Sequence, residues 1–360
     1  MSVSIAKGIA IIFIVIVHAG SPMIINQMVS PIAITVFFFM SGYCFKEKYL
    51  NDAKTFAQKR ISGIYLPYLR WSLLFLLLHN VFYHLNIYSD AYGFNGRTSV
   101  LYTATDYFNK AVSIATKMQG HEQLLGAYWF LKSLFVGAFI FYAIAVLESR
   151  LSEKMSSKPL HGPWWGMLIL LFATVLLSLF DCRLPYFNIG SREFFAATII
   201  YAGYLYKQRQ WLWHRRMAVN IIALIAMTAG SQFWFTTMLY YDYWKVLPHT
   251  VSASLAVLTL LHLSEWISKR KDLFPARMLV FIGDHTMTIL TWHFLSLKLV
   301  SLLLIAIYGL PIKQLSEFPV MEKYAHQGWW ILYLCVGVSI PVLWTYCYHR
   351  LKDTICGSNI

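Results

Sequence analysis

Hydrophobic residues fill long stretches of the chain, and polar residues gather in the segments between them. About 20 mainly apolar residues suffice for a helix to cross a bilayer. Windows of this kind lie near residues 3–20, 29–45, 63–83, 127–147, 164–180, 193–206, 217–238, 246–266, 283–308 and 329–348. The pattern predicts an all-α, polytopic integral membrane protein of about ten transmembrane helices. We expect residues 1–360 to form a single transmembrane domain, with no separate soluble domain.

Two of these segments admit a second interpretation. Segment 3–20 also resembles a signal peptide, but Pro22 directly after its small residues disfavours cleavage, so we expect a retained helix. Segment 193–206 is short and follows Pro185 and Gly190, which fits a broken or re-entrant helix as well as a tilted one.

The longest connection between predicted spans covers about residues 84–126. Within it, apolar residues recur at helical spacing over Val100 to Lys117. This spacing predicts a helix that either rests on the membrane surface or packs as a cover over the helix ends.

Composition and charge support membrane insertion and give an orientation. Hydrophobic residues make up 58% of the 360 and charged residues only 13%, a balance that a soluble protein cannot accommodate. Lys and Arg number 19 on one side of the predicted spans and 8 on the other, which predicts that both termini are cytoplasmic. The net charge of +14 then reflects topology, and nucleic-acid binding is not needed to explain it.

Some kinds of site are disfavoured by missing motifs. The five cysteines are scattered and never form a CxxC pair, so we expect neither a disulfide framework nor a metal site. The sequence also lacks a GxxxxGK[ST] loop and an HExxH helix, which argues against an ATP-driven pump and a metalloprotease.

Ionisable residues inside the predicted spans are candidates for function, because each costs about 2.5–3.5 kcal/mol to insert. They are Lys7, His18, Arg70, His79, Lys132, His262, His293 and Lys298, with Glu265 near a span end. Lys7 and His18 stand out because eleven residues place them on one helix face, about 16 Å apart. His18 has aliphatic neighbours and suits a general base near neutral pH, although a buried structural histidine is the alternative.

Five segments carry a family resemblance, in the order in which the family has them. They are the K-x10-H spacing from Lys7 to His18, VFFFMSGYCF at 36–45, KRISGIYLPYLRW at 59–71, AYWFLKSLF at 127–135 and FIGDHTMTILTWHF at 281–294. Together they resemble the acyltransferase 3 family of membrane proteins, including its fucose 4-O-acetylase-like and polysaccharide O-acetyltransferase members. The chain departs from the R-x-x-R often found at the third helix, and Arg70 is the candidate to replace the missing cation.

The resemblance implies a reaction and a donor site. The family moves an acyl group, usually acetyl from acetyl-CoA, to a hydroxyl of a sugar in a cell-surface polysaccharide or its lipid-linked precursor. It thereby implies a multi-pass protein of the bacterial inner (plasma) membrane, with acyl-CoA as co-substrate and no metal. Lys7, with Lys59 and Arg60, would hold the CoA phosphates at the cytoplasmic side. His18 would act as the general base, and an acyl-histidine intermediate is the competing route.

Further residues are expected to complete the site. Arg70 and Lys132 are the candidates to stabilise the developing oxyanion. Trp129, Lys132 and His293 are the candidates to bind the carbohydrate acceptor, with Trp129 stacking on a sugar ring.

Two other functions fit the same residues. A carrier or flippase for lipid-linked sugars would use the intramembrane cations as a translocation path, without acyl-transfer chemistry. A polysaccharide polymerase or ligase would also need many spans, but its catalytic residues are expected in a larger outer loop. Turnover of acyl-CoA separates the acyltransferase from both alternatives. A homodimer is expected from the abundance of aromatic and small residues on the spans.

Overall fold

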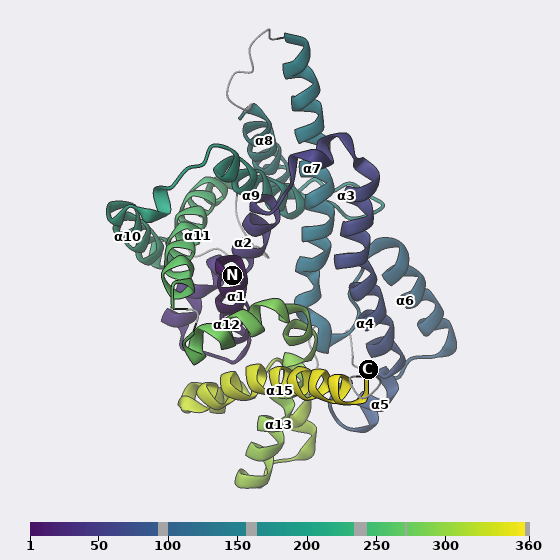
Figure 1. Cartoon of the computed structure of the whole chain (residues 1–360). Coiled ribbons are helices and arrows are strands. Elements are labelled where there is room, and N and C mark those ends of the chain that lie inside the picture. The colour runs from purple at the N-terminus through teal and green to yellow at the C-terminus, as the bar shows by residue number, and fades with distance from the viewer. Residues whose placement is uncertain (93–99, 156–163, 234–242, 271, 357–360) are drawn as a thin grey trace.

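The computed structural model describes residues 1–92, 100–155, 164–233, 243–270 and 272–356. Across these ranges the chain is helical and has no strand longer than one isolated bridge, between Leu184 and Ile189. The helices (Figure 1) are α1 (Ser2–His18), α2 (Met23–Tyr43), α3 (Ala53–Arg60), α4 (Leu66–Leu77), α5 (His79–His84), α6 (Ala104–Lys117), α7 (Trp129–Met155), α8 (Trp165–Leu179), α9 (Ser191–Gln208), α10 (Met217–Phe233), α11 (Val246–Ser268), α12 (Phe274–Asp284), α13 (Thr286–Tyr308), α14 (Glu322–Tyr324) and α15 (Trp330–Cys356).

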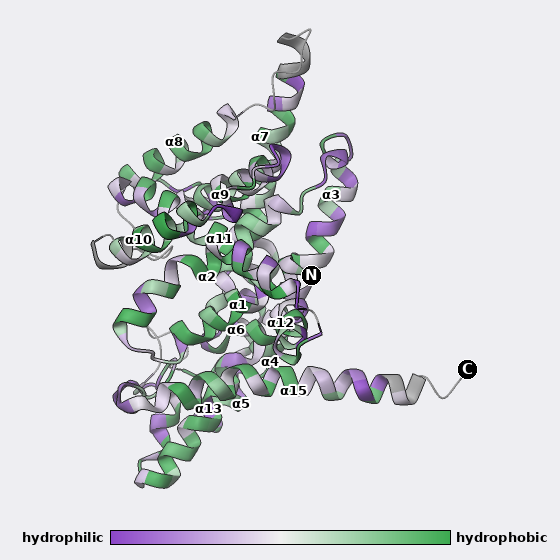
Figure 2. Ribbon diagram, turned by 60° about the vertical axis from the view of Figure 1, so that its left-hand side comes forward, coloured by the Kyte–Doolittle hydropathy of each residue, from purple (hydrophilic) through white to green (hydrophobic). Residues whose placement is uncertain are grey.

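The predicted all-α membrane architecture is confirmed, and a helix occupies each of the ten predicted segments. Five helical stretches are long and apolar enough to cross a membrane: Met23–Tyr43, Gln123–Leu151, Tyr243–Ser268, Thr286–Tyr308 and Glu322–Lys352. Shorter apolar helices cover Ser2–His18, Trp165–Leu179 and Met217–Ala229. The count of ten spans and the cytoplasmic location of the termini therefore stay predictions. In Figure 2 α15 runs out of the bundle toward the side on which α1 begins.

Helix α1 lies between two buried apolar clusters. Ile11, Ile14 and Val15 belong to one cluster, which includes residues of α4, α13 and α15. Ala6 and Ala10 belong to the other, which includes residues of α2, α9 and α11. Figure 1 shows α1 in the middle of the molecule, in contact with α2, α11, α12, α13 and α15. The helix that carries the K-x10-H spacing is therefore held from both sides.

Close backbone contact fixes α1 against α12. A methyl group added at Gly8 would lie 2.4 Å from the carbonyl oxygen of Leu279, and one added at Gly283 would lie 1.7 Å from that of Ser4. Such approach is possible only with small residues on both helices. The Ser4 hydroxyl also donates a hydrogen bond of 2.7 Å to the Asp284 carboxylate.

Two predicted segments differ in detail from the structure, and a third is found as the expected helix. Segment 63–83 is divided, because a π-helical turn at Ile61–Tyr65 precedes α4 and a break at Leu78 separates α4 from α5. Segment 193–206 is the continuous, largely buried helix α9, so a broken helix is wrong there. The helix expected within 100–117 is α6, whose start is stabilised by a capping box between Thr103 and Asp106.

Helix α6 packs against the bundle and is apolar on its outer face as well. The Tyr65 hydroxyl donates a 2.7 Å hydrogen bond to the carbonyl of Ala115, and Ile114 is buried. On the opposite face the side chains of Phe108 and Val112 are 69% and 44% exposed. The helix therefore acts as a packed cover, and its exposed apolar face suits a membrane surface.

Candidate active site

Two histidines from opposite ends of the chain meet inside the bundle. Nδ1 of His18, in the last turn of α1, lies 3.1 Å from Nε2 of His293 on α13. The rings stack with centroids 5.2 Å apart. His293 is fully buried, whereas His18 is half-buried. His18 is therefore the more exposed member of the pair.

The hydrogen bonds of His293 determine which nitrogen of each neutral ring carries the proton. Nδ1 of His293 lies 3.1 Å from the carbonyl oxygen of Ile289 and 2.9 Å from that of Leu290. Carbonyl oxygens only accept, so Nδ1 of His293 is the protonated donor and its Nε2 carries the lone pair. His18 then donates its Nδ1–H to His293. Consequently Nε2 of His18 carries a lone pair that is available for proton abstraction.

Aromatic side chains surround the pair. The ring of Phe294 lies 4.6 Å from that of His18 and 4.0 Å from that of His293, and the ring of Phe318 follows at 4.7 Å from Phe294. The buried ammonium of Lys298 donates a 2.6 Å hydrogen bond to the carbonyl of Glu317, next to Phe318. This cation holds the chain after α13 against the helix, so its role here is structural.

The remaining predicted donor and catalytic residues lie apart from the pair. Lys7 is half-buried at the opposite end of α1. On α3, Lys59 lies 5.6 Å from the ring of Tyr49 and Arg60 lies 5.2 Å from that of Phe56.

The Arg70 side chain is exposed, with its guanidinium 5.1 Å from the ring of Trp71. Trp71 packs edge-on against Trp292, the residue before His293, with centroids 5.3 Å apart. The connection from Arg70 to the histidine pair is therefore indirect.

Trp129 and Lys132, the other predicted acceptor residues, line a cavity of about 870 Å³. Its walls come from the end of α6, from η3 (Gln123–Tyr128), from the starts of α7 and α9, from the connection 181–190 and from η5 (Tyr243–Lys245). Arg192 stacks on Trp129 at 4.8 Å, and Lys132 donates a 2.5 Å hydrogen bond to the carbonyl of Phe187.

A buried histidine–carboxylate pair lies beside this cavity. Nδ1 of His79 is 3.1 Å from Oε2 of Glu122, and its ring stacks on Tyr102 with centroids 3.3 Å apart. Burial raises the pKa of Glu122, and the contact with His79 opposes this shift. Burial also raises the pKa of Tyr88, and the nearby Glu122 charge adds to the effect. The pair joins α5 to the segment before η3, and thus positions one cavity wall.

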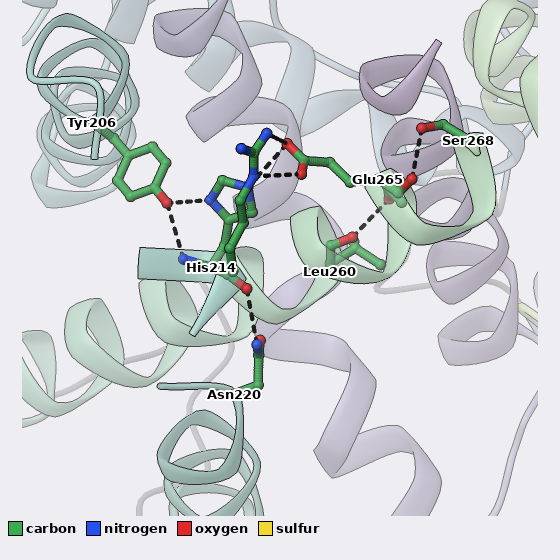
Figure 3. Close-up of polar contacts among 8 residues, drawn as sticks. Tyr206, His214, Asn220, Leu260, Glu265 and Ser268 are labelled. Atoms are coloured by element: carbon green, nitrogen blue, oxygen red, sulfur yellow. Dashed lines mark hydrogen bonds and ion pairs between the residues drawn. The ribbon is translucent and has the colours of Figure 1, made fainter. Parts of the chain in front are cut away.

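A second polar cluster, shown in Figure 3, joins α9, α10 and α11. The Tyr206 hydroxyl contacts Nδ1 of His214, while Nε2 of His214 lies 3.0 Å from the Glu265 carboxylate. Arg215 binds the same carboxylate at 3.0 Å, and Asn220 donates a 2.9 Å hydrogen bond to the His214 carbonyl. Sequence reasoning noted Glu265 but missed His214, because His214 lies between predicted spans. The cluster links the ends of these helices, so its role is structural.

Among the described residues, no group of three or more His, Cys, Asp or Glu side chains is arranged to hold a metal ion.

Comparison with known proteins gives one match. The family model described as an acyltransferase domain, that of the acyltransferase 3 family, matches residues 2–349. No curated protein and no solved structure gives a significant match. The matched region runs from α1 into α15, so both histidines and the whole cavity wall lie within it.

Proposed function

The chain belongs to the acyltransferase 3 family, and from this premise we propose that it transfers an acyl group from acyl-CoA to a sugar hydroxyl. We propose acetyl as the acyl group. The proposed acceptor is a sugar of a cell-surface polysaccharide or of its lipid-linked precursor. The observation that carries the proposal is the hydrogen bond between His18 and His293, which leaves a lone pair on Nε2 of His18.

In the proposed reaction His18 acts as the general base. Its Nε2 takes the proton of the sugar hydroxyl as the hydroxyl oxygen attacks the thioester carbonyl. The new C–O bond forms, the C–S bond breaks, and the CoA sulfur leaves with the proton that His18 returns. His293 is a positioning residue, because it continues to accept the Nδ1–H of His18 when the ring becomes an imidazolium. This role is related to that of the third member of a catalytic triad, although a neutral imidazole stabilises the cation less than a carboxylate does.

The donor is proposed to enter from the Lys7 end of α1. Eleven residues of helix separate Lys7 from His18, about 16 Å along the axis, a distance comparable with the extended pantetheine arm of CoA. Lys7 then holds CoA phosphates, and Lys59 and Arg60 on α3 supply further cations at the same side. This geometry is supported by the packing of α1, which fixes both ends of the helix.

The test is acyl transfer by purified protein in lipid nanodiscs, with acyl-labelled acetyl-CoA and a mixed glycan acceptor pool. We expect His18→Ala and His18→Gln to lower transfer about 10²–10⁴-fold, the usual contribution of a general base, while acyl-CoA binding persists. The matched control is His262→Gln, another half-buried helical histidine, and it should retain activity.

Acid quenching separates the two chemical routes. Labelled protein recovered after quenching supports an acyl-histidine intermediate, whereas its absence supports direct attack. A wild-type protein that neither binds nor consumes acyl-CoA overturns the proposal and favours the carrier for lipid-linked sugars.

A further inference from the structure

The cavity beside Trp129 carries more positive than negative side chains. Its lining includes five cations, Lys117, Lys132, Arg183, Arg192 and Lys245, against three acids, Glu122, Asp181 and Glu193. We call this space the basic cavity. Its size of about 870 Å³ fits a sugar unit or a short oligosaccharide.

Two of the three acids are already bound to groups of the protein. The Glu193 carboxylate accepts 2.9 Å hydrogen bonds from the Gly190 N–H and the Ser133 hydroxyl, and its side chain is buried. Oε2 of Glu122 binds His79. Asp181 lies 3.7 Å from Arg183, and both side chains are well exposed. These contacts orient the acids without removing their charges, and the Glu193 carboxylate acts electrostatically on Lys132. Five cations against three acids still leave the basic cavity with an excess of positive side chains.

The lysines contact neutral groups. The ammonium of Lys132 binds the carbonyl oxygen of Phe187, and that of Lys117 lies 5.4 Å from the ring of Tyr186. These contacts orient the cations without cancelling their charge. Helix α9 begins at the cavity wall, and the positive end of its dipole adds to the same potential.

One layer of aromatic rings separates the basic cavity from the histidine pair. Gly126 lines the cavity, and a methyl group added there would lie 3.3 Å from the Phe318 ring and 3.8 Å from the Phe294 ring. The Phe294 ring is in turn 4.6 Å from that of His18. The basic cavity therefore lies one ring layer away from the proposed base, and neither histidine is part of its lining.

We propose that the basic cavity binds the acceptor through a negatively charged group, either a sugar carboxylate or a phosphate. Lys117 and Lys132 provide the charge that recognises this group, and Trp129 contacts the sugar ring. This inference rests on the proposed function, because it assigns the second substrate of that reaction to the basic cavity.

The test is binding of defined probes to the full-length protein in neutral-lipid nanodiscs, measured by calorimetry at two salt concentrations. The probes are an oligogalacturonate, a neutral oligosaccharide of equal length, and decyl phosphate. We expect the oligogalacturonate or decyl phosphate to bind at least about tenfold more tightly than the neutral sugar, with affinity falling as salt rises. Preference between these two probes identifies the carboxylate or the phosphate as the recognised group.

The double variant Lys117→Gln/Lys132→Gln should weaken binding of the anionic probe at least about tenfold. Lys323→Gln is the matched control, because Lys323 also lies over a tyrosine ring, 5.7 Å from Tyr324, but does not line the basic cavity. Equal affinity for neutral and anionic probes, or unchanged anion binding in the double variant, overturns the inference.

In the absence of acceptor, slow transfer of the acetyl group to water releases CoA from acetyl-CoA. Measuring this release distinguishes failure of this inference from failure of the proposed function. We expect this release to vanish in His18→Ala and to persist in Lys323→Gln, whose lysine does not line the basic cavity. Anion binding without any CoA release would refute the acyltransferase proposal and leave the anion site standing. CoA release without anion preference would refute only the anion site.

Discussion

Nδ1 of His18 and Nε2 of His293 lie 3.1 Å apart, although 275 residues separate them in the sequence. Backbone carbonyls on α13 bind the other nitrogen of His293 and so determine the direction of the hydrogen bond between the rings. The orientation and tautomer of the proposed base therefore depend on a residue that need not touch the substrate.

Changing His293 tests this dependence. We expect His293→Ala to lower kcat about 10–100-fold with little change in the KM for acyl-CoA, because positioning is lost while donor binding remains. His293→Gln should recover part of the loss, since its amide oxygen can still accept the Nδ1–H of His18. Steady-state kinetics in nanodiscs provide the measurement. Equal losses in both variants, with a lowered melting temperature, would indicate a purely structural residue.

Lys7 tests the donor end of α1. Lys7→Gln should raise the KM for acetyl-CoA about tenfold and leave kcat nearly unchanged, because a phosphate contact far from the thioester contributes uniform binding. Lys54→Gln, which changes an exposed lysine on α3, is the control and should leave KM unchanged. A fall in kcat without a change in KM would contradict a phosphate-binding role.

Glu122 predicts a pH dependence of stability. Burial raises its pKa in the folded state, so folding favours the protonated carboxyl. The stability that the protonated carboxyl contributes to the folded state is fully present below the ordinary carboxyl pKa. It is lost as pH rises through the raised pKa. We expect the melting temperature of the wild type, relative to Glu122→Gln, to be higher at pH 4 than at pH 8. Thermal unfolding across this range is the measurement. A pH-independent difference would refute the prediction.

Gly8 tests the close packing of α1 on α12. Gly8→Ala places a methyl group 2.4 Å from the Leu279 carbonyl oxygen, so the helices must separate. We expect a loss of about 1–3 kcal/mol in stability and lower transfer activity, because both ends of the proposed site lie on α1. Gly63→Ala is the control, since nothing lies within 4 Å of a methyl group there. Equal thermal stability of the two variants would show that α1 and α12 do not require this contact.

Patterns within one helix could be interpreted from the sequence, whereas contacts between helices could not. Hydropathy located the helices because every span in lipid must be apolar and must satisfy its backbone hydrogen bonds internally. The eleven-residue spacing placed Lys7 and His18 on one helix, but no periodicity pairs His18 with a residue of α13. Pro185 and Gly190 suggested a break in α9, yet both precede its first residue. The basic cavity draws its walls from several separate segments, so Trp129 and Lys132 could be predicted only as isolated candidates.

The central position of α1 has a consequence for how the protein is made. Helix α1 is synthesised well before its partners α12, α13 and α15, which follow it by more than 250 residues. Until those helices are inserted, His18 has no His293, and Gly8 has no helix to pack against. The histidine pair therefore forms only after α13 has been synthesised, and a nascent chain that stops after α11 contains His18 without its partner His293.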